Sequence, residues 1–381
     1  MEHPILIKNA TVYAPEKLGS RDIFIAGGKI VAMEEKLDIA LPGLEVIDAA
    51  GAIVTPGLID QHIHVTGGGG EGGWKSRCPE LVFSELVRAG VTTFLGVSGT
   101  DSMSRSISNL LAKVRGLKEE GASGWMWTSN YSYPVTTITD CVKTELFAIP
   151  EVLGVKIALG DHRSSFPSME QVRAIVADVR ISGMLTGKTG FLHVHLGDFP
   201  CSFDIFDAIV ASGLPIKHIR PTHVARHPKV FERAMEFAKK GGMIDITTGG
   251  GCYMGTAADA VKMALDNGVP LDRITLSSDG HGSMPRFNEA GEMVGLATGS
   301  IMCDMEAVRD LAKAYGLETA LRPMTVNIAR ALCLPGKGEI AVGADADLLF
   351  MTDDFEITDV FMNGRQCMKA GEVIVKGAFE E

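Results

Sequence analysis

The middle of the chain alternates short apolar runs, typical of buried strands, with segments whose apolar residues recur at helical spacing. One helical stripe, ended by a pair of glycines, consists of Val230, Phe231, Ala234, Met235 and Ala238. The runs predicted as strands are residues 52–65, 91–98, 123–132, 155–161, 191–197, 218–224, 243–249 and 273–280. Because parallel strands need crossover helices, this alternation predicts an α/β protein built on a (β/α)8 TIM barrel.

The two ends of the chain show a different pattern. Residues 3–50 and 336–380 contain short runs joined by glycine-containing turns, which predict antiparallel strands. Neither flank is long enough to close a core alone, so we expect both to join in one small β-sandwich. The predicted division is a small β-sandwich domain from residues 1–54 and 336–381, and a barrel domain from residues 55–335.

Composition and charge exclude several classes of partner. The 381 residues carry a formal net charge of -11, which disfavours binding to nucleic acid or to an anionic membrane. No apolar run reaches the roughly 18 residues of a membrane-spanning helix, and the first residues do not resemble a signal peptide. Seven scattered cysteines without a Cys-x-x-Cys pair fit reduced thiols. We therefore expect a cytoplasmic protein.

Two histidines end the first predicted barrel strand, in the stretch IDQHIHVTGGGGEGG. Side chains at positions i and i+2 of a strand point to the same side, so His62 and His64 share a face. At the carboxyl-terminal mouth of a barrel, two imidazoles form half of a zinc site. For an isolated His-x-His, two hydrogen-bonded structural histidines are an equally good interpretation.

Further metal-binding groups end other predicted strands. These groups are Lys156, His195, His223 and Asp279. Taken alone, a lysine is usually a surface ion-pair partner, and an aspartate before a glycine is usually a helix cap. Together with His62 and His64, however, these four residues place six candidate ligands around one mouth. His193 shares the face of His195 one layer deeper, and His281 competes as a ligand or as a group behind the ligands. Both alternatives stay open at this stage.

This ligand set resembles that of the amidohydrolase superfamily members with a binuclear metal centre. More narrowly, the chain resembles the isoaspartyl (β-aspartyl) dipeptidases from end to end. The resemblance is carried by GLIDQHIHVTGGGGEGG, GVKIALGDHRS, PTHVARH, LSSDGHGS and GKGEIAVGADADLL. It implies that the flanks form the small sandwich, that the site binds two zinc ions or other divalent metals, and that the protein forms a homo-oligomer, specifically an octamer.

The resemblance also implies a carbamate on Lys156, formed with carbon dioxide. A lysine ammonium, with an ordinary pKa of about 10.4, cannot coordinate a cation, whereas a carbamate is an anion that can bridge two metals. A metal-bridging hydroxide is the implied nucleophile, with Asp279 as the general base. The implied ligand sets are His62, His64 and Asp279 for one zinc ion, and His195 and His223 for the other.

A β-aspartyl dipeptide carries one ammonium and two carboxylates, so its binding site needs an anion and guanidinium groups. Glu71 is the candidate partner of the ammonium, and the neighbouring glycines let the N–H groups of Gly69 and Gly70 face the substrate. Without the two histidines before it, this glycine tract is better read as a flexible turn. The resemblance makes substrate ligands of Thr100, Tyr131, Arg163, Arg226 and Ser283.

The resemblance further implies that Tyr131 polarises the scissile carbonyl, although Tyr133 shares its predicted face. The predicted function is a zinc-dependent dipeptidase that hydrolyses the isopeptide bond of β-aspartyl dipeptides. The alternative is a cyclic-amide hydrolase of the dihydroorotase or hydantoinase type; a non-catalytic scaffold is disfavoured because no ligand is missing. Two features depart from the family: His281, where a smaller uncharged polar residue is expected, and the glycine-rich loop 247–256.

Overall fold

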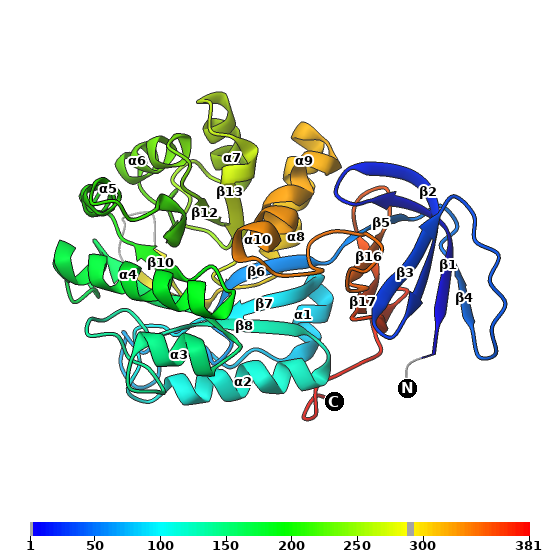
Figure 1. Cartoon of the computed structure of the whole chain (residues 1–381), viewed down its shortest axis with the longest axis horizontal. Coiled ribbons are helices and arrows are strands. Elements are labelled where there is room, and N and C mark those ends of the chain that lie inside the picture. The colour runs from blue at the N-terminus through cyan, green and yellow to red at the C-terminus, as the bar shows by residue number, and fades with distance from the viewer. Residues whose placement is uncertain (1–2, 288–292) are drawn as a thin grey trace.

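Each predicted barrel run contains a strand or overlaps one in the computed structural model, which describes residues 3–287 and 293–381 (Figure 1). One strand, β9 (Val152–Leu159), begins three residues before its predicted run. The prediction of eight strands at these positions is therefore confirmed. Their bounds are β6 (Leu58–Ile63), β7 (Val91–Gly96), β8 (Ser123–Thr128), β9 (Val152–Leu159), β10 (Phe191–Leu196), β11 (Ile219–Thr222), β12 (Ile244–Thr247) and β13 (Ile274–Ser277).

Hydrogen-bonded ladders, together with the packing of β11 against β12, arrange these strands around a ring. Strands β6 to β11 pair in chain order in one six-stranded sheet, and β12 pairs in parallel with β13. The first and last strands approach where a parallel bridge joins Ile63 to Gly280, and the N–H of His64 donates to the carbonyl of Gly280 at 2.9 Å. The fold is mixed α/β and TIM-barrel-like, so the carboxyl ends of the strands open onto a common mouth.

Helices cover the outside of this ring because each has one apolar face. The predicted stripe of α6 is buried together with Phe237. Helix α4 begins at Ser168, which exchanges hydrogen bonds with Gln171 in a capping box, and it ends at Gly187 with φ at 72°. The helices are α1 (Phe83–Ala89), α2 (Ile107–Glu120), α3 (Val142–Ala148), α4 (Met169–Thr186), α5 (Ser202–Ala211), α6 (Pro228–Lys239), α7 (Ala257–Asp266), α8 (Cys303–Tyr315), α9 (Leu317–Leu321) and α10 (Val326–Leu332), with 3-10 turns η1 (Ile216–His218), η2 (Leu271–Arg273) and η3 (Arg322–Met324).

The two flanks of the chain meet in one nine-stranded sheet beside the ring (Figure 1). The flanks are joined where β5 pairs antiparallel with β16. The expectation of purely antiparallel strands is wrong at β1, which pairs in parallel with β4 and, farther along, with β5. The chain crosses over once, through β2 and β3, before β4 and β5 run beside β1 in the same direction. The strands are β1 (Ile5–Tyr13), β2 (Lys17–Ala26), β3 (Lys29–Glu34), β4 (Glu45–Asp48), β5 (Ile53–Pro56), β16 (Leu348–Met351), β17 (Ile357–Met362), β18 (Arg365–Lys369) and β19 (Glu372–Val373).

The sheet has a separate apolar core, which includes Ile7, Val12, Ile23, Leu348 and Phe361. Its strand β5 extends to Pro56, and β6 of the ring begins directly afterwards, at Leu58. At the mouth of the ring, β14 (Ser283–Phe287) and β15 (Met293–Thr298) pair antiparallel. Across the described ranges, no helix combines the length and the apolar character needed to cross a membrane.

Candidate metal centre

The six predicted metal ligands lie together at the carboxyl ends of the strands. Two come from β6 and the residue after it, one each from β9 and β10, and two from the loops that follow β11 and β13. All are buried, with at most 7% of the residue surface exposed. They are His62, His64, Lys156, His195, His223 and Asp279.

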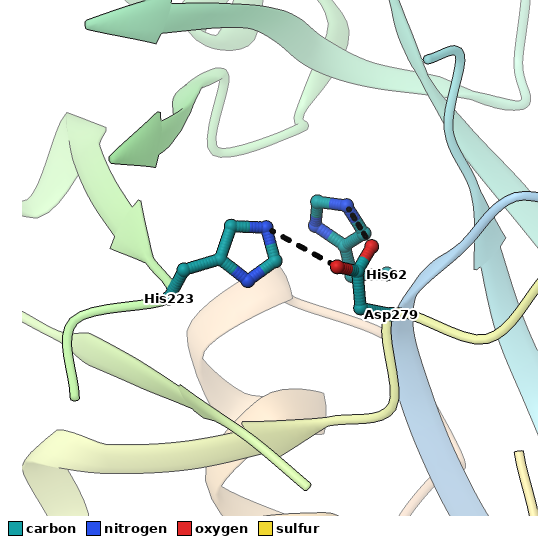
Figure 2. A group of neighbouring side chains, drawn as sticks. All are labelled: His62, His223 and Asp279. Atoms are coloured by element: carbon teal, nitrogen blue, oxygen red, sulfur yellow. Dashed lines mark ion pairs between the residues drawn. The ribbon is translucent and has the colours of Figure 1, made fainter. Parts of the chain in front are cut away.

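His62, His223 and Asp279 form one compact group, with a ligand atom from each within 4.8 Å of the other two. Figure 2 shows the Asp279 carboxylate facing both imidazoles. Its Oδ1 lies 3.4 Å from Nε2 of His62, and its Oδ2 lies 3.8 Å from Nε2 of His223. His64 joins them, since its Nε2 lies 3.2 Å from Oδ1 of Asp279.

The bonding around this group leaves donor atoms for a cation. Nδ1 of His223 lies 2.6 Å from the Thr247 hydroxyl, while its Nε2 is buried and has no hydrogen-bond partner among the described residues. Asp279 Oδ1 is also buried without a hydrogen-bond partner in that part of the chain. Buried polar atoms are rarely left unpaired, and imidazole nitrogens and carboxylate oxygens are the donors that zinc prefers. The residues therefore fit a bound divalent cation.

The protonation states suit the same role. Burial, together with the positive charge of Lys156, lowers the pKa of His62 well below its usual value, and burial does the same for His223. Burial alone would raise the pKa of Asp279, but His223, His64 and Arg226 outweigh it and hold that pKa well below the usual range. The site thus presents neutral imidazoles and an ionised carboxylate, which are the forms that bind metals.

Lys156 points into this group from β9. Its Nζ lies 3.1 Å from Nε2 of His62 and 2.9 Å from the carbonyl oxygen of Ser98. The side chain is fully buried and, in the described part of the chain, forms no ion pair. Burial lowers the pKa of Lys156 to about 7, against the opposing effect of Asp279. A neutral amine is the form that reacts with carbon dioxide, so the position suits a carbamate.

His193 lies behind the ligands, as its place on β10 predicts. Its Nε2 lies 2.8 Å from Nδ1 of His62, and its ring stacks on Trp127 at 4.9 Å between centroids. If Nδ1 of His62 carries the proton and donates it to His193, the lone pair of His62 Nε2 faces the centre. Such a second contact fixes the tautomer and the ring orientation of a metal-binding histidine.

His195 stands beside the compact group rather than in it. Its ring lies 4.5 Å from that of His223, but its Nδ1 is 2.9 Å from the Tyr131 hydroxyl and its Nε2 is 3.0 Å from Oδ2 of Asp161. Both nitrogens of His195 are therefore occupied, because Tyr131 and Asp161 flank the imidazole. Metal binding by His195 requires one of these two contacts to be exchanged.

Asp161 is a residue of the site that the sequence did not single out. Besides His195, it accepts hydrogen bonds from Arg163 at 2.9 and 2.8 Å. Burial alone would raise the pKa of Asp161, but Arg163 and His195 hold it well below its ordinary range. The only feature of the sequence that could have pointed to Asp161 is its position just after β9, two residues before Arg163, which was predicted to bind the substrate.

Two of the ligand positions have unusual backbone conformations. His223 has φ at 63° and Asp279 has φ at 55°, in the left-handed region that residues with a Cβ seldom adopt. Such strain persists only where surrounding contacts impose it, and it concentrates at functional sites. The turns after β11 and β13 thus aim both side chains back over the mouth.

A cavity of about 540 Å³ opens over these ligands. Of the predicted substrate residues, those that line it are Gly69, Glu71, Tyr131, Arg163, Arg226 and Ser283. Thr100 and Gly70 line an adjoining cavity on the other side of Glu71. The competitor Tyr133 does not line the main cavity, whereas Tyr131 does and also contacts His195.

Charged groups are paired across this cavity. Glu71 Oε1 accepts hydrogen bonds from the Thr100 hydroxyl at 3.0 Å and from Arg163 at 3.1 Å. Arg226 donates to Oδ2 of Asp279 at 2.7 Å. A carboxylate and two guanidinium groups therefore stand around the candidate metal centre, where they can exchange these partners for an ammonium and carboxylates.

The two glycines before Glu71 are required by the backbone itself. Gly69 has φ at 89°, and a side chain there would collide with the carbonyl of Ser76. The N–H of Gly70 donates to that same carbonyl at 3.0 Å. The expectation that the Gly70 N–H faces the substrate is therefore wrong in this structure, because the turn uses that donor.

The two departures from the family lie in different places. His281 points away from the metal ligands: its Nε2 is 3.3 Å from Glu85 on α1, and its Nδ1 is 3.0 Å from the carbonyl of Pro79. It is therefore not placed as a ligand in this structure. The 247–256 loop does reach the cavity, through Gly250 and Gly251.

Comparison with known proteins places this site in a family. The amidohydrolase family profile matches residues 53–367. A beta-aspartyl dipeptidase of Fervidobacterium islandicum AW-1, solved in complex with beta-Asp-Leu dipeptide, is 40% identical, with a TM-score of 0.90 over 97% of this chain and 98% of that one. The dihydroorotase of Pelotomaculum thermopropionicum is 27% identical over 92% of this chain and 89% of its own. A dihydropyrimidinase of Brevibacillus agri NCHU1002, 18% identical with a TM-score of 0.69, shares the fold.

The chain therefore belongs to the amidohydrolase family of hydrolases. Within that family, it is similar over almost its whole length to beta-aspartyl dipeptidases.

Proposed function

We propose that this protein is a zinc-dependent dipeptidase that hydrolyses the isopeptide bond of β-aspartyl dipeptides. The observation that carries the proposal is the placement of Glu71, Arg163 and Arg226 around one cavity above the candidate metal ligands. A free β-aspartyl dipeptide presents one ammonium and two carboxylates, which match one carboxylate and two guanidinium groups. The similarity to the Fervidobacterium beta-aspartyl dipeptidase supports the same substrate class.

In this proposal, Glu71 binds the substrate ammonium while Thr100 holds the glutamate in place. Arg163 and Arg226 bind the two carboxylates, as guanidinium groups do with two parallel hydrogen bonds. Ser283, at the cavity wall, supplies a further hydroxyl. Gly69 gives the polar groups of the substrate room beside the metals, since no side chain projects there.

The metal ligands are His62, His64, His195, His223, Asp279 and Lys156, the last as its carbamate. When bound there, two zinc ions would supply Lewis acidity toward the scissile carbonyl and would lower the pKa of water. Asp279 accepts a proton from the attacking water and passes it to the leaving amine. Tyr131 donates a hydrogen bond to the developing oxyanion, and burial raises the pKa of its phenol, which keeps that proton in place.

We also propose that residues 55–335 close as a complete (β/α)8 barrel, and that residues 1–54 and 336–381 form a small β-sandwich. The parallel ladders of the ring and the joining of both flanks in one sheet support this division. We propose further that the protein forms a homo-oligomer, an octamer, and that it is cytoplasmic. The proposal includes no nucleic-acid or membrane partner. Its support is the family resemblance, the scattered cysteines and the net charge of -11.

A substrate panel tests the function. The full-length protein, supplied with zinc and bicarbonate, is assayed with β-Asp-Leu, α-Asp-Leu, dihydroorotate and a hydantoin. We expect hydrolysis of β-Asp-Leu and little turnover of the other compounds. Turnover of the cyclic amides in preference to β-Asp-Leu would instead support the cyclic-amide hydrolase, a class to which the similarity with the dihydroorotase also points.

A further inference from the structure

A second cavity, of about 330 Å³, lies at the opposite end of the ring from the metal ligands. Its walls come from the amino ends of the strands: Phe191 begins β10, Arg220 is the second residue of β11, and Met243 and Arg273 immediately precede β12 and β13. The exposed tip of α10 adds Arg330. The cavity therefore shares no residue with the proposed hydrolytic site.

Arg220 is the central group of this cavity. Only 2% of its surface is exposed, and it still lines the cavity wall. One nitrogen, Nη2, donates to the side chain of Gln61 at 2.7 Å, and the guanidinium lies over the Phe191 ring at 5.2 Å. The other nitrogen, Nη1, is buried with no hydrogen-bond partner among the described residues.

An unpartnered guanidinium nitrogen inside a protein is costly, because a buried charge without compensation loses its hydration. The nearby carboxylate of Asp245 does not supply that partner: its hydrogen bonds come from Gln61, Thr222, Thr275 and Ser277. Burial lowers the pKa of Arg220 to about 10, so the group remains charged at neutral pH. Arg220 itself is one of the residues that line the cavity.

Three further cationic side chains lie on the cavity wall. Lys217, Arg273 and Arg330 join Arg220, against one carboxylate, Asp272. That carboxylate lies 3.7 Å from Arg273, while Lys217 and Arg330 form no ion pair within the described ranges. An adjoining cavity, which shares Lys217, adds Arg180. In a chain with a net charge of -11, this local concentration of positive charge favours the approach of an anion.

We propose that this cavity binds a small anion that carries phosphate or carboxylate oxygens and at least two negative charges. The guanidinium fork of Arg220 matches such oxygens, and the surplus of cations over Asp272 favours a multiply charged ligand. Lys217 and Arg330 are exposed at the rim, so the anion enters from solvent. The site is separate from hydrolysis and does not depend on the proposed substrate.

The test uses the zinc-loaded full-length protein, with inorganic phosphate and succinate as probes at constant ionic strength. An anion that binds the folded state raises the melting temperature, and calorimetric titration counts the sites. Because phosphate can also reach the zinc ions, the decisive comparison is between variants. The double variant Lys217→Ala/Arg330→Ala removes the rim, and Arg365→Gln, an exposed arginine on β18, is the matched control.

We expect phosphate, succinate or both to raise the melting temperature by several degrees in the wild type and in Arg365→Gln. The double variant should show no such shift, and its calorimetric titration should count one binding site fewer. The probe that acts identifies the phosphate or the carboxylate source. The hydrolysis rate should stay at the wild-type value in all three proteins. An equal shift in the double variant, or no shift with either anion in the wild type, would overturn the proposal. Arg220→Met, where it folds, should behave as the double variant does.

Discussion

Nζ of Lys156 lies 3.1 Å from Nε2 of His62, so a buried primary amine points directly at a ring nitrogen of a predicted metal ligand. An ammonium at this position would repel a divalent cation. The same amine as a carbamate would attract one and supply two oxygen donors. The contact therefore makes the chemical state of Lys156 decisive for metal loading.

Replacing Lys156 with methionine should remove the carbamate while filling the same buried volume. We expect the folded variant to bind less zinc than the wild type, because the oxygen donors of the carbamate would be lost, and to lose β-Asp-Leu hydrolysis. Metal analysis and steady-state kinetics measure both effects. Lys143→Met, at an exposed lysine on α3, is the control. A Lys156→Met protein that keeps two zinc ions would contradict a metal-binding role of Lys156.

His193→Leu should weaken zinc binding about 10- to 100-fold, since the removed side chain holds the ring of His62 in its orientation. Competition with a chromophoric chelator measures the affinity. His193→Gln can still accept the hydrogen bond from His62, so it should recover part of the loss. If the leucine variant binds zinc as tightly as the wild type, His193 has only a packing role against Trp127.

Glu71→Gln should lower kcat/KM for β-Asp-Leu about 10- to 100-fold, because a hydrogen bond to a charged group contributes about 1.5–3 kcal/mol. Zinc content should not change, since Glu71 contacts Thr100 and Arg163 rather than a metal ligand. Glu80→Gln, an exposed glutamate near the same mouth, serves as the matched control. Unchanged kinetics in Glu71→Gln would count against recognition of the substrate ammonium by this residue.

His281→Asn should keep the full zinc content, because the imidazole contacts Glu85 and the carbonyl of Pro79 instead of the metal ligands. Loss of the contact with Glu85 should lower the free energy of unfolding by about 1 kcal/mol or less, as for other partly exposed ion pairs. Denaturant unfolding of His281→Asn, Glu85→Gln and the double variant measures this coupling. Additive losses in the double variant would show that the two side chains do not interact.

Glu151 should make stability depend on pH. Its carboxylate is hydrogen-bonded by Arg115 and Lys118, which outweigh the effect of burial and lower its pKa from 4.5 to about 2. A carboxylate with a depressed folded-state pKa stabilises the protein above pH 4.5, and this contribution is lost as the pH falls from 4.5 to about 2. Thermal unfolding of wild type and Glu151→Gln should therefore differ at pH 7 and converge near pH 2. A constant difference over that range would contradict this assignment.

The eight strands could be predicted from the sequence because apolar side chains must repeat at short range wherever a strand is buried on both faces. The positions of His62 and His64 follow from the same local geometry, since alternate side chains of a strand share a side. The nine-stranded sheet was harder to predict. Parallel pairing of β1 with β4 and β5 depends on one crossover, through β2 and β3, that no local pattern encodes.

The sequence by itself determined which residues stand at the carboxyl ends of the strands, and hence which side chains can reach a common mouth. Only the tertiary structure decided which partners these side chains contact. Asp161 contacts His195, His193 contacts His62 from behind, and His281 turns toward Glu85. It also revealed Arg220 at the far end of the ring, with its Nη1 buried and without a hydrogen-bond partner among the described residues. These contacts join residues far apart in the chain, so they arise from ring closure and side-chain direction, which periodicity along the sequence does not specify.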